Sequence, residues 1–161
     1  MGANSITPRR FFLLVLLLSA GPLAFALISQ YAFGFEPCQL CQYQRIPYWA
    51  LIALSLMALI IPGVDQHGSA WIVPAIFACG AVLAFYHVGV EQHWWASTCS
   101  AQGNLSMSFD DFRAGPLKPI LKSCDTIDWM LFGMSMATYN MVLSAVLAIS
   151  AATAAWAMAK R

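Results

Sequence analysis

Four of the five cysteines in the chain have positions from which their thiols could exchange electrons. Cys38 and Cys41 form a C-x-x-C pair, and Cys99 and Cys124 follow later in the chain. A C-x-x-C bridge closes a very small loop and gains little stability by the chain-entropy argument, so such pairs are typically labile and catalytic. Thiol–disulfide chemistry is therefore favoured. The fifth cysteine, Cys79, lies within an apolar stretch, where it is expected to act as a small hydrophobe.

Other uses of these cysteines fit the spacing less well. A zinc site would prefer two short-spaced pairs, which Cys99 and Cys124 do not provide, although His93 lies close by. A haem attachment site requires C-x-x-C-H, and Gln42 stands in place of the histidine. Static structural disulfides remain the open alternative.

Arg45 lies four residues after Cys41, so the two side chains share a face once a helix has started. A helix N-terminus and a guanidinium both lower the pKa of a thiol and favour the reactive thiolate. The sequence thus predicts that Cys41 is activated by both. A plainer alternative is that Arg45, at the rim of an apolar stretch, extends its head group to the membrane surface.

The composition places this chemistry in a membrane. The chain has 161 residues, of which 60% are hydrophobic and only 9% are charged, and its net charge is +1. Soluble domains carry about 25% charged residues, so this chain has too few charges to cover a water-facing surface. A soluble globular enzyme, a disordered tail and a nucleic-acid binder, which would need a basic patch, are excluded.

Four uncharged stretches are long enough to cross the bilayer as helices. They predict an all-α membrane protein in which residues 1–161 form a single domain, a bundle of four transmembrane helices. The predicted spans are approximately residues 11–33, 45–62, 69–90 and 131–158. An even number of spans puts both termini on one side of the membrane. The loops of about residues 30–45 and 91–128, which contain the four candidate redox cysteines, then share the other side.

The distribution of charged residues and cysteines indicates which side of the membrane the termini and the loops face. Lys and Arg near the span ends are divided evenly, but Arg9 and Arg10 adjoin the first helix, which favours cytoplasmic termini. Cysteines confined to the opposite side suggest an oxidising compartment, the periplasm bordering a bacterial inner membrane. The first stretch also fits a cleavable signal peptide with Ala24-Phe25-Ala26 as its cleavage motif, but its apolar run continues through Phe33.

Three sequence blocks resemble the disulfide bond formation protein B (DsbB) family of quinone-linked thiol oxidoreductases. The first resembles the family signature P-C-x-L-C-x-x-[QE]-R, and the others resemble the end of its third helix and the start of its fourth. The blocks are EPCQLCQYQR (36–45), YHVGVE (86–91) with Trp94-Trp95, and CDTIDW (124–129) with FGMSMA (132–137). Their order, their spacing and the four-span layout agree with the family over nearly the whole chain.

The resemblance implies an activity and a direction of electron flow. The protein would re-oxidise a periplasmic thiol oxidase of the DsbA type and reduce a membrane quinone, either ubiquinone or menaquinone. Cys99 would be the sulfur that the partner's thiolate attacks, and Cys124 would be its disulfide partner. Electrons would then pass to Cys38 and Cys41, with Cys41 facing the quinone.

Four residues are candidates for quinone binding. The resemblance implies that Arg45 steadies the Cys41 thiolate and a quinone oxygen, and that Met136 matches the family's quinone-contacting methionine on the fourth helix. His87 and Glu91 are candidates by position alone and are equally consistent with buried interface residues. A quinone is also favoured because no flavin or dinucleotide motif such as G-x-G-x-x-G occurs in the chain. No metal is expected.

The third loop carries a local prediction of its own. Ser108-Phe109-Asp110-Asp111 fits a capping box that would open a short helix on the membrane surface, ended by Gly115-Pro116. Tethering that helix to the membrane would bring the Cys99–Cys124 pair near the first-loop pair.

Two alternative functions stay open. One is a member of the same family that serves a dedicated thiol partner instead of a general DsbA-type oxidase. The other, from a different class, is a non-enzymatic membrane scaffold held by static disulfides. It predicts that a Cys38–Cys41 bridge resists mild reductant and that added quinone oxidises nothing.

Overall fold

The structure is a computed structural model, and it describes residues 7–95, 123–127 and 129–160. Within these residues, four helical spans are long and apolar enough to cross a membrane: Pro8–Tyr31, Gln39–Ile60, Gln66–Glu91 and Met136–Ala159. The predicted all-α, four-helix membrane architecture is thereby confirmed. Cys99 and the helix expected at Ser108 lie outside the described residues.

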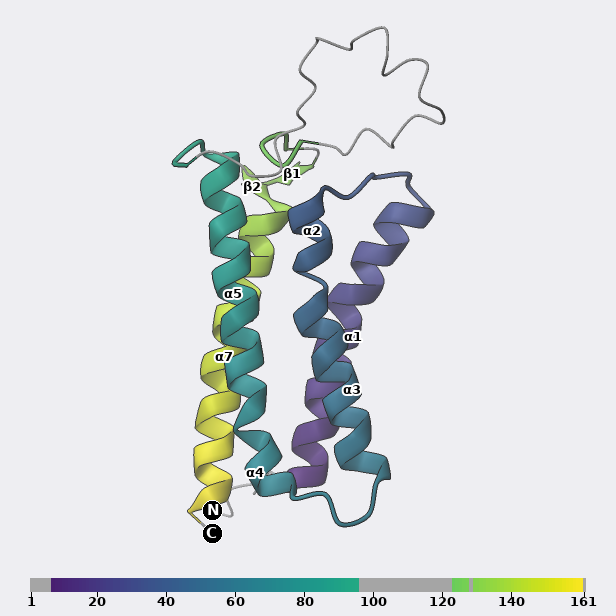
Figure 1. Cartoon of the computed structure of the whole chain (residues 1–161), viewed down its shortest axis with the longest axis vertical. Helices are drawn as coiled ribbons and strands as arrows, with labels where there is room; N and C mark the ends of the chain where they lie inside the picture. The colour runs from purple at the N-terminus through teal and green to yellow at the C-terminus, as the bar shows by residue number, and fades with distance from the viewer. Residues whose placement is uncertain (1–6, 96–122, 128, 161) are drawn as a thin grey trace, which may run out of the picture.

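The four spans form two packed pairs of helices. α1 (Pro8–Tyr31) packs mainly against α3 (Ile46–Ile60), and α5 (Ile72–Glu91) packs mainly against α7 (Met136–Ala159). Figure 1 shows the two pairs standing side by side. The short helix α2 (Gln39–Tyr43) continues α3 at one end of the bundle, and α4 (Gln66–Ala70) precedes α5 at the other.

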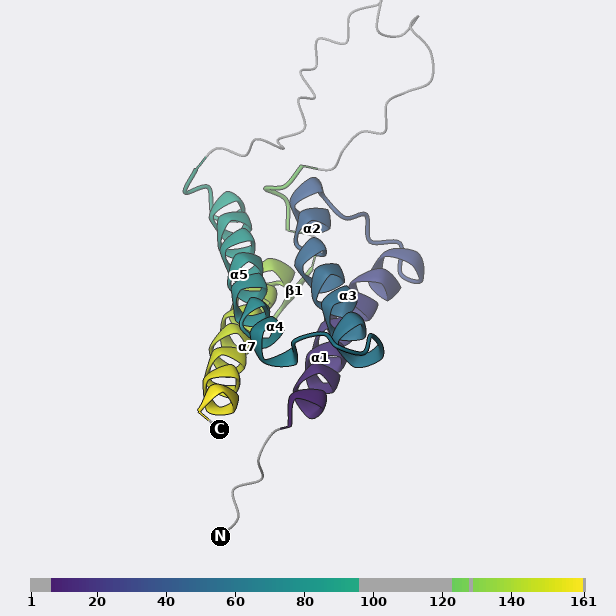
Figure 2. The same cartoon turned by 60° about the horizontal axis from the view of Figure 1, so that its bottom comes forward.

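The two ends of the bundle carry different parts of the chain. The start of α1 and the end of α7 lie at one end, while α2 and the two short strands lie at the opposite end (Figures 1 and 2). Residues on either side of the long third loop therefore meet the first loop at the same end of the molecule. This is the arrangement that exchange between the two cysteine pairs requires.

Large apolar side chains cover the outside of the bundle. Leu17, Ile60, Val82 and Ile149 are among the most exposed of them. The interior instead contains a compact apolar cluster that includes Phe12, which is fully buried. An outer surface of this kind is unfavourable in water and is suited to lipid. Cys79 lies exposed on α5, in keeping with its expected role as a small hydrophobe.

The second span is interrupted between α2 and α3. Pro47 has no backbone N–H, so the carbonyl of Tyr43 cannot receive the usual helical hydrogen bond. Accordingly α2 ends at Tyr43, Gln44 and Arg45 form a turn, and α3 begins at Ile46. The helical part of this span starts at Gln39 and not at about residue 45, because α2 forms upstream of the break.

The fourth span starts at Met136 and not at about residue 131, because a hairpin precedes it. β1 (Met130–Leu131) and β2 (Met134–Ser135) pair in antiparallel fashion. The two residues between them, Phe132 and Gly133, have φ values of 50° and 77°. Two consecutive positive φ values are typical of a tight type I′ hairpin turn, and Gly133 adopts this conformation without strain.

Candidate active site

The C-x-x-C pair lies at the start of α2, where Cys38 is the N-cap residue. The Cys38 sulfur accepts a hydrogen bond from the backbone N–H of Cys41 at 3.3 Å, and the two sulfurs lie 3.0 Å apart. Both residues are free thiols in this structure. The helix N-terminus therefore acts on Cys38, not on Cys41 as the sequence predicted, because α2 starts earlier than the expected helix.

The surroundings of Cys38 stabilise its thiolate. They lower the pKa of the Cys38 thiol from the ordinary value of 9.0 to about 4. The hydrogen bond from the Cys41 thiol is the largest cause, and the His87 ring lowers the pKa further, while burial acts in the opposite direction. Since the thiolate is the nucleophilic form of cysteine, Cys38 is in its reactive state at neutral pH.

The low pKa of Cys38 gives a prediction that can be read spectroscopically. In the reduced protein, the ultraviolet thiolate band of Cys38 should persist at neutral pH and decline only as the pH falls through about 4. The measurement is the difference spectrum between the parent protein and Cys38→Ser. Cys79→Ser, which removes an exposed thiol, is the matched control and should leave the titration unchanged. A band that is lost near the ordinary thiol pKa of about 8.5 would contradict the prediction.

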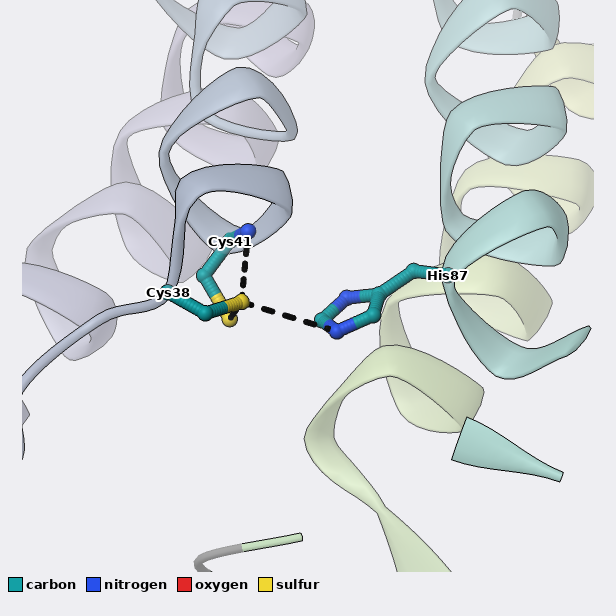
Figure 3. A group of neighbouring side chains, drawn as sticks. All are labelled: Cys38, Cys41 and His87. Atoms are coloured by element: carbon teal, nitrogen blue, oxygen red, sulfur yellow. Dashed lines mark hydrogen bonds between the residues drawn. The ribbon is translucent and has the colours of Figure 1, made fainter. Parts of the chain in front are cut away.

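His87 faces the cysteine pair from α5. Figure 3 shows the imidazole ring reaching across from α5 towards the two sulfurs at the start of α2. The Nε2 atom of His87 lies 3.6 Å from the Cys38 sulfur, and the side chain is 4% exposed. The ring is thus a buried partner of Cys38 contributed by a different span.

A chain of polar side chains orients the His87 ring. The Tyr48 hydroxyl donates to Asn140 Oδ1 at 2.5 Å, and Asn140 Nδ2 donates to Gln44 Oε1 at 2.5 Å. Gln44 Nε2 then lies 2.6 Å from His87 Nδ1. Because an amide N–H can only donate, Nδ1 accepts, and the proton of the neutral ring is on Nε2, facing the Cys38 sulfur. These hydrogen bonds therefore select the His87 tautomer that can donate to the Cys38 thiolate.

Removing a member of this series of hydrogen bonds should destabilise the helix bundle. Tyr48 and Gln44 are 5% and 7% exposed, and Asn140→Leu removes a hydrogen-bond partner from each. Gln44 Oε1 then loses its donor, and the Tyr48 hydroxyl keeps only Ser144, at 3.2 Å. We expect a loss of about 1–2 kcal/mol in the free energy of unfolding. Thermal unfolding in detergent measures it. Ser150→Ala, at an exposed position of the same helix, is the control, and equal unfolding midpoints for the two variants would contradict the prediction.

A cavity of about 390 Å³ adjoins the cysteine pair, bounded by residues of α1, α2, α3, α5 and α7. Its walls are mainly apolar, with Pro22 and Phe25 on α1 among the lining residues. Cys41 lines this cavity, whereas Cys38 does not. The cavity can accept an apolar planar molecule with its polar atoms near Cys41.

Three of the four candidate quinone-binding residues line this cavity together with Cys41. They are Arg45, His87 and Met136. Arg45 is half-buried, and its Nη1 donates to Gln30 Oε1 at 2.6 Å, so its guanidinium is held between helices and does not simply extend to the surface. Met136 is the first residue of α7.

Glu91, the fourth candidate, does not line the cavity. Its Oε2 accepts a hydrogen bond from the hydroxyl of Ser135 at 2.5 Å, and its Oε1 lies 3.8 Å from His87 Nε2. Ser135 also caps α7 by accepting from the backbone N–H of Thr138 at 3.2 Å. Glu91 thus links the end of α5 to the start of α7, and its carboxylate also lies close to the His87 ring.

The first and third loops meet at this site. Cys38 and Cys124 belong to one buried cluster with Leu40 and Val90. Cys124 is disulfide-bonded, and its backbone also forms a hydrogen bond with His87. Because Cys99 lies outside the described residues, the pairing of Cys99 with Cys124 stays a prediction.

Four uncharged polar residues that were not predicted from the sequence hold the site in place. Gln30, Gln44, Tyr48 and Asn140 all line the cavity or orient groups that do. A signal was present, because uncharged polar side chains inside apolar membrane spans are costly and are often functional. Their partners could not be read from the sequence, since Gln44 and Asn140 lie on separate spans.

Comparisons with known proteins identify one family. The profile of a family described as disulfide bond formation protein DsbB matches residues 8–154. The chain is similar to disulfide bond formation protein B of Xanthomonas oryzae pv. oryzae, at 32% identity over 170 residues, covering 91% of this chain and 89% of the relative. The protein of the same description from Aromatoleum aromaticum is 27% identical over 161 residues, covering 94% of each chain. An uncharacterised protein of Rickettsia prowazekii is 31% identical over 156 residues, covering 92% and 90%. No solved structure matches the chain.

Proposed function

The chain belongs to the disulfide bond formation protein DsbB family, and we propose that it re-oxidises a periplasmic thiol oxidase of the DsbA type and passes the two electrons to a membrane quinone. Membership of the family supports a disulfide oxidoreductase that acts in disulfide bond formation. The thiol partner and the quinone are the finer parts of the proposal, and the geometry around the cysteines argues for them.

We base the proposal on one observation: of the two cysteines of the C-x-x-C pair, only Cys41 borders the apolar cavity. Cys38 belongs to the buried cluster that contains Cys124; Cys41 packs against that cluster and also lines the cavity beside Arg45 and His87. A dithiol that receives electrons from one side and delivers them to the other needs this division. The Cys38 side would exchange with the Cys124 disulfide, and the Cys41 side would meet the oxidant.

The thiol half of the reaction is a pair of disulfide exchanges. The partner's thiolate attacks Cys99, which breaks the Cys99–Cys124 bond and forms a mixed disulfide; the partner's second thiol then resolves it and leaves as the oxidised protein. The reduced pair next exchanges with the Cys38–Cys41 disulfide and becomes oxidised again. Each exchange forms one S–S bond and breaks one, so two electrons and two protons reach Cys38 and Cys41.

The residues around the cavity fit a quinone as the final acceptor. A bound quinone supplies a two-electron, two-proton acceptor that is soluble in the membrane. The apolar walls suit its ring, and Arg45 and His87 are polar lining residues that would bind its oxygens beside Cys41. Met136 would contact the ring, and Glu91 would act only through Ser135 and His87. The choice between ubiquinone and menaquinone is left to experiment.

The proposed location follows from the same arrangement. We infer a multi-pass protein of a bacterial inner membrane, a single domain with cytoplasmic termini, whose loops of about residues 30–45 and 91–128 lie in the periplasm. Cys38 and Cys124 lie at the same end of the bundle, as this topology requires.

A partner-driven assay tests the proposed function. Purified protein is mixed without oxygen with a reduced DsbA-type oxidase and excess quinone, and the quinone absorbance is followed. The proposal predicts continuous quinone reduction that depends on the thiol protein, with one quinone reduced for each partner oxidised. Absence of turnover with either ubiquinone or menaquinone would contradict it. Replacing the general oxidase with other thiol partners separates a general from a dedicated role.

A further inference from the structure

The two thiols and the His87 ring form a compact set of metal-ligating atoms. The Cys38 and Cys41 sulfurs and a ring nitrogen of His87 all lie within 4.8 Å of one another. Cys38 and His87 are buried, and Cys41 is half-buried. His93, the histidine that the sequence placed near the later cysteines, is not in this set. Thiolate and imidazole together are the ligands that zinc and similar soft cations prefer.

We propose that the reduced Cys38–Cys41 pair and His87 bind one thiophilic divalent cation, such as Zn²⁺ or Cd²⁺. The distance from the Cys38 sulfur to the His87 ring already fits a tetrahedral site. Zn–S bonds of about 2.3 Å and Zn–N bonds of about 2.0–2.1 Å place sulfur and nitrogen ligands about 3.6 Å apart and two sulfurs about 3.8 Å apart. The Cys38 sulfur and His87 Nε2 are 3.6 Å apart.

One ligand must move for the site to close around the ion. The two sulfurs are 3.0 Å apart, so their separation has to increase by about 0.8 Å to reach tetrahedral spacing. A rotation of the half-buried Cys41 side chain provides this. Cys41 and His87 both line the cavity, so the fourth coordination position is left for water or a small anion there. Three protein ligands with one open position is a known type of zinc site.

Charge balance favours a divalent over a monovalent cation. Binding displaces the Cys41 thiol proton, so the ion meets two thiolates and a neutral imidazole. A divalent ion makes this complex neutral, whereas a monovalent ion such as Cu⁺ leaves a net negative charge at a buried position. Burying an uncompensated charge is costly.

The hydrogen bonds that link His87, Gln44 and Asn140 must exchange their donors and acceptors when the ion binds. A metal at Nε2 needs the lone pair of that atom, so the ring proton moves to Nδ1 and must find an acceptor there. Gln44 can supply Oε1 by turning its amide, and Asn140 can turn in response, because both side chains contain a donor and an acceptor. Gln44→Glu would present an acceptor without any rearrangement and is expected to strengthen metal binding.

The site exists only in the reduced protein. In a Cys38–Cys41 disulfide neither sulfur is a thiolate, so the ion loses two of its three ligands. A bound ion in turn coordinates a lone pair of each thiolate, whereas oxidation to the disulfide must remove two electrons from these sulfurs and join them by one bond. Metal binding would therefore hold the pair in its reduced state and inhibit its oxidation. This inference is independent of the proposed function, since it concerns binding to the dithiol itself.

Cadmium is the probe, because sulfur-to-cadmium charge transfer absorbs in the ultraviolet. The full chain is purified in detergent, reduced, freed of reductant without oxygen and titrated with Cd²⁺; bound metal per chain is measured after desalting. Reduction also breaks the Cys124 disulfide, so the site is counted as a difference between variants. We expect the reduced parent protein to bind one more Cd²⁺ per chain than reduced Cys38→Ser, and His87→Ala to weaken the binding of this ion more than about tenfold. Cys79→Ser, the matched thiol control outside the cluster, should bind like the parent. The re-oxidised protein should no longer bind this Cd²⁺ ion.

Gln44→Glu keeps the test decisive if His87→Ala fails to fold. It should bind Cd²⁺ about tenfold more tightly than the parent protein. The proposal is overturned if the reduced parent protein binds no Cd²⁺, if Cys38→Ser binds as much as the parent, or if His87→Ala or Gln44→Glu folds and leaves the affinity unchanged. Because this experiment measures metal binding, Cd²⁺ can bind even if the partner-driven assay shows no turnover. Equally, turnover can be observed even if Cd²⁺ does not bind.

Discussion

Replacing Cys41 with serine is expected to abolish quinone reduction while the protein still folds and inserts into the membrane. Cys41 is the sulfur of the pair that lines the cavity, and without it the dithiol cannot form the disulfide that releases two electrons. Cys38→Ser should cause the same loss, because Cys38 supplies the second sulfur and packs with Cys124. Quinone absorbance in the partner-driven assay should fall to the rate of the uncatalysed reaction in both variants.

The control for these variants is Cys79→Ser. Cys79 lies exposed on α5 and outside the cavity, so its loss should leave turnover unchanged. Retained turnover in Cys38→Ser or Cys41→Ser would refute the assignment of the redox pair. The scaffold alternative predicts instead that the parent protein itself reduces no quinone.

Replacing Arg45 with glutamine is expected to weaken quinone use much more than thiol exchange. Arg45 lines the cavity with Cys41, and its Nη1 donates to Gln30 Oε1 at 2.6 Å, so the side chain is held beside the cavity. A hydrogen bond from a charged donor contributes about 1.5–3 kcal/mol, which corresponds to an increase of roughly 10- to 100-fold in the apparent KM for quinone. Steady-state kinetics with quinone as the varied substrate measures the change.

Arg10→Gln serves as the matched control for Arg45→Gln. Arg10 is exposed near the start of α1, at the opposite end of the bundle from the cysteine pair. Its replacement should leave the KM for quinone unchanged. An unaltered KM in Arg45→Gln would contradict the proposed role of this residue and return it to the plainer interpretation of an arginine at the membrane rim.

The architecture was predictable because its cause is compositional. Long uncharged stretches bounded by single charged residues define membrane spans regardless of how the helices pack. The even number of spans puts the two cysteine-bearing loops at one end of the bundle, and the cluster of Cys38 with Cys124 agrees with that arrangement. What composition could not give was the detail at the ends of the spans, where Pro47 ends α2 and the turn at Phe132-Gly133 delays α7.

The candidate site was predictable only in part. The C-x-x-C spacing and Arg45 mark the site in the sequence, and the structure brings them together with His87 and Met136. The assignment of the helix N-terminus to Cys41 failed, because one turn of helix decides which sulfur is the cap. The contact between Gln44 and Asn140 joins separate spans, and helices that are apolar on all sides give no periodicity from which to infer their facing sides.

A single-turnover measurement shows whether Cys38 and Cys41 transfer two electrons to a membrane quinone without an intermediate carrier. The reduced protein, without any thiol partner, is mixed anaerobically with quinone, and the disulfides formed are mapped by mass spectrometry. We expect quinone reduction coupled to a new Cys38–Cys41 disulfide, and no quinone reduction by reduced Cys41→Ser. Quinone reduction without a Cys38–Cys41 disulfide, or no reduction at all, would contradict this expectation.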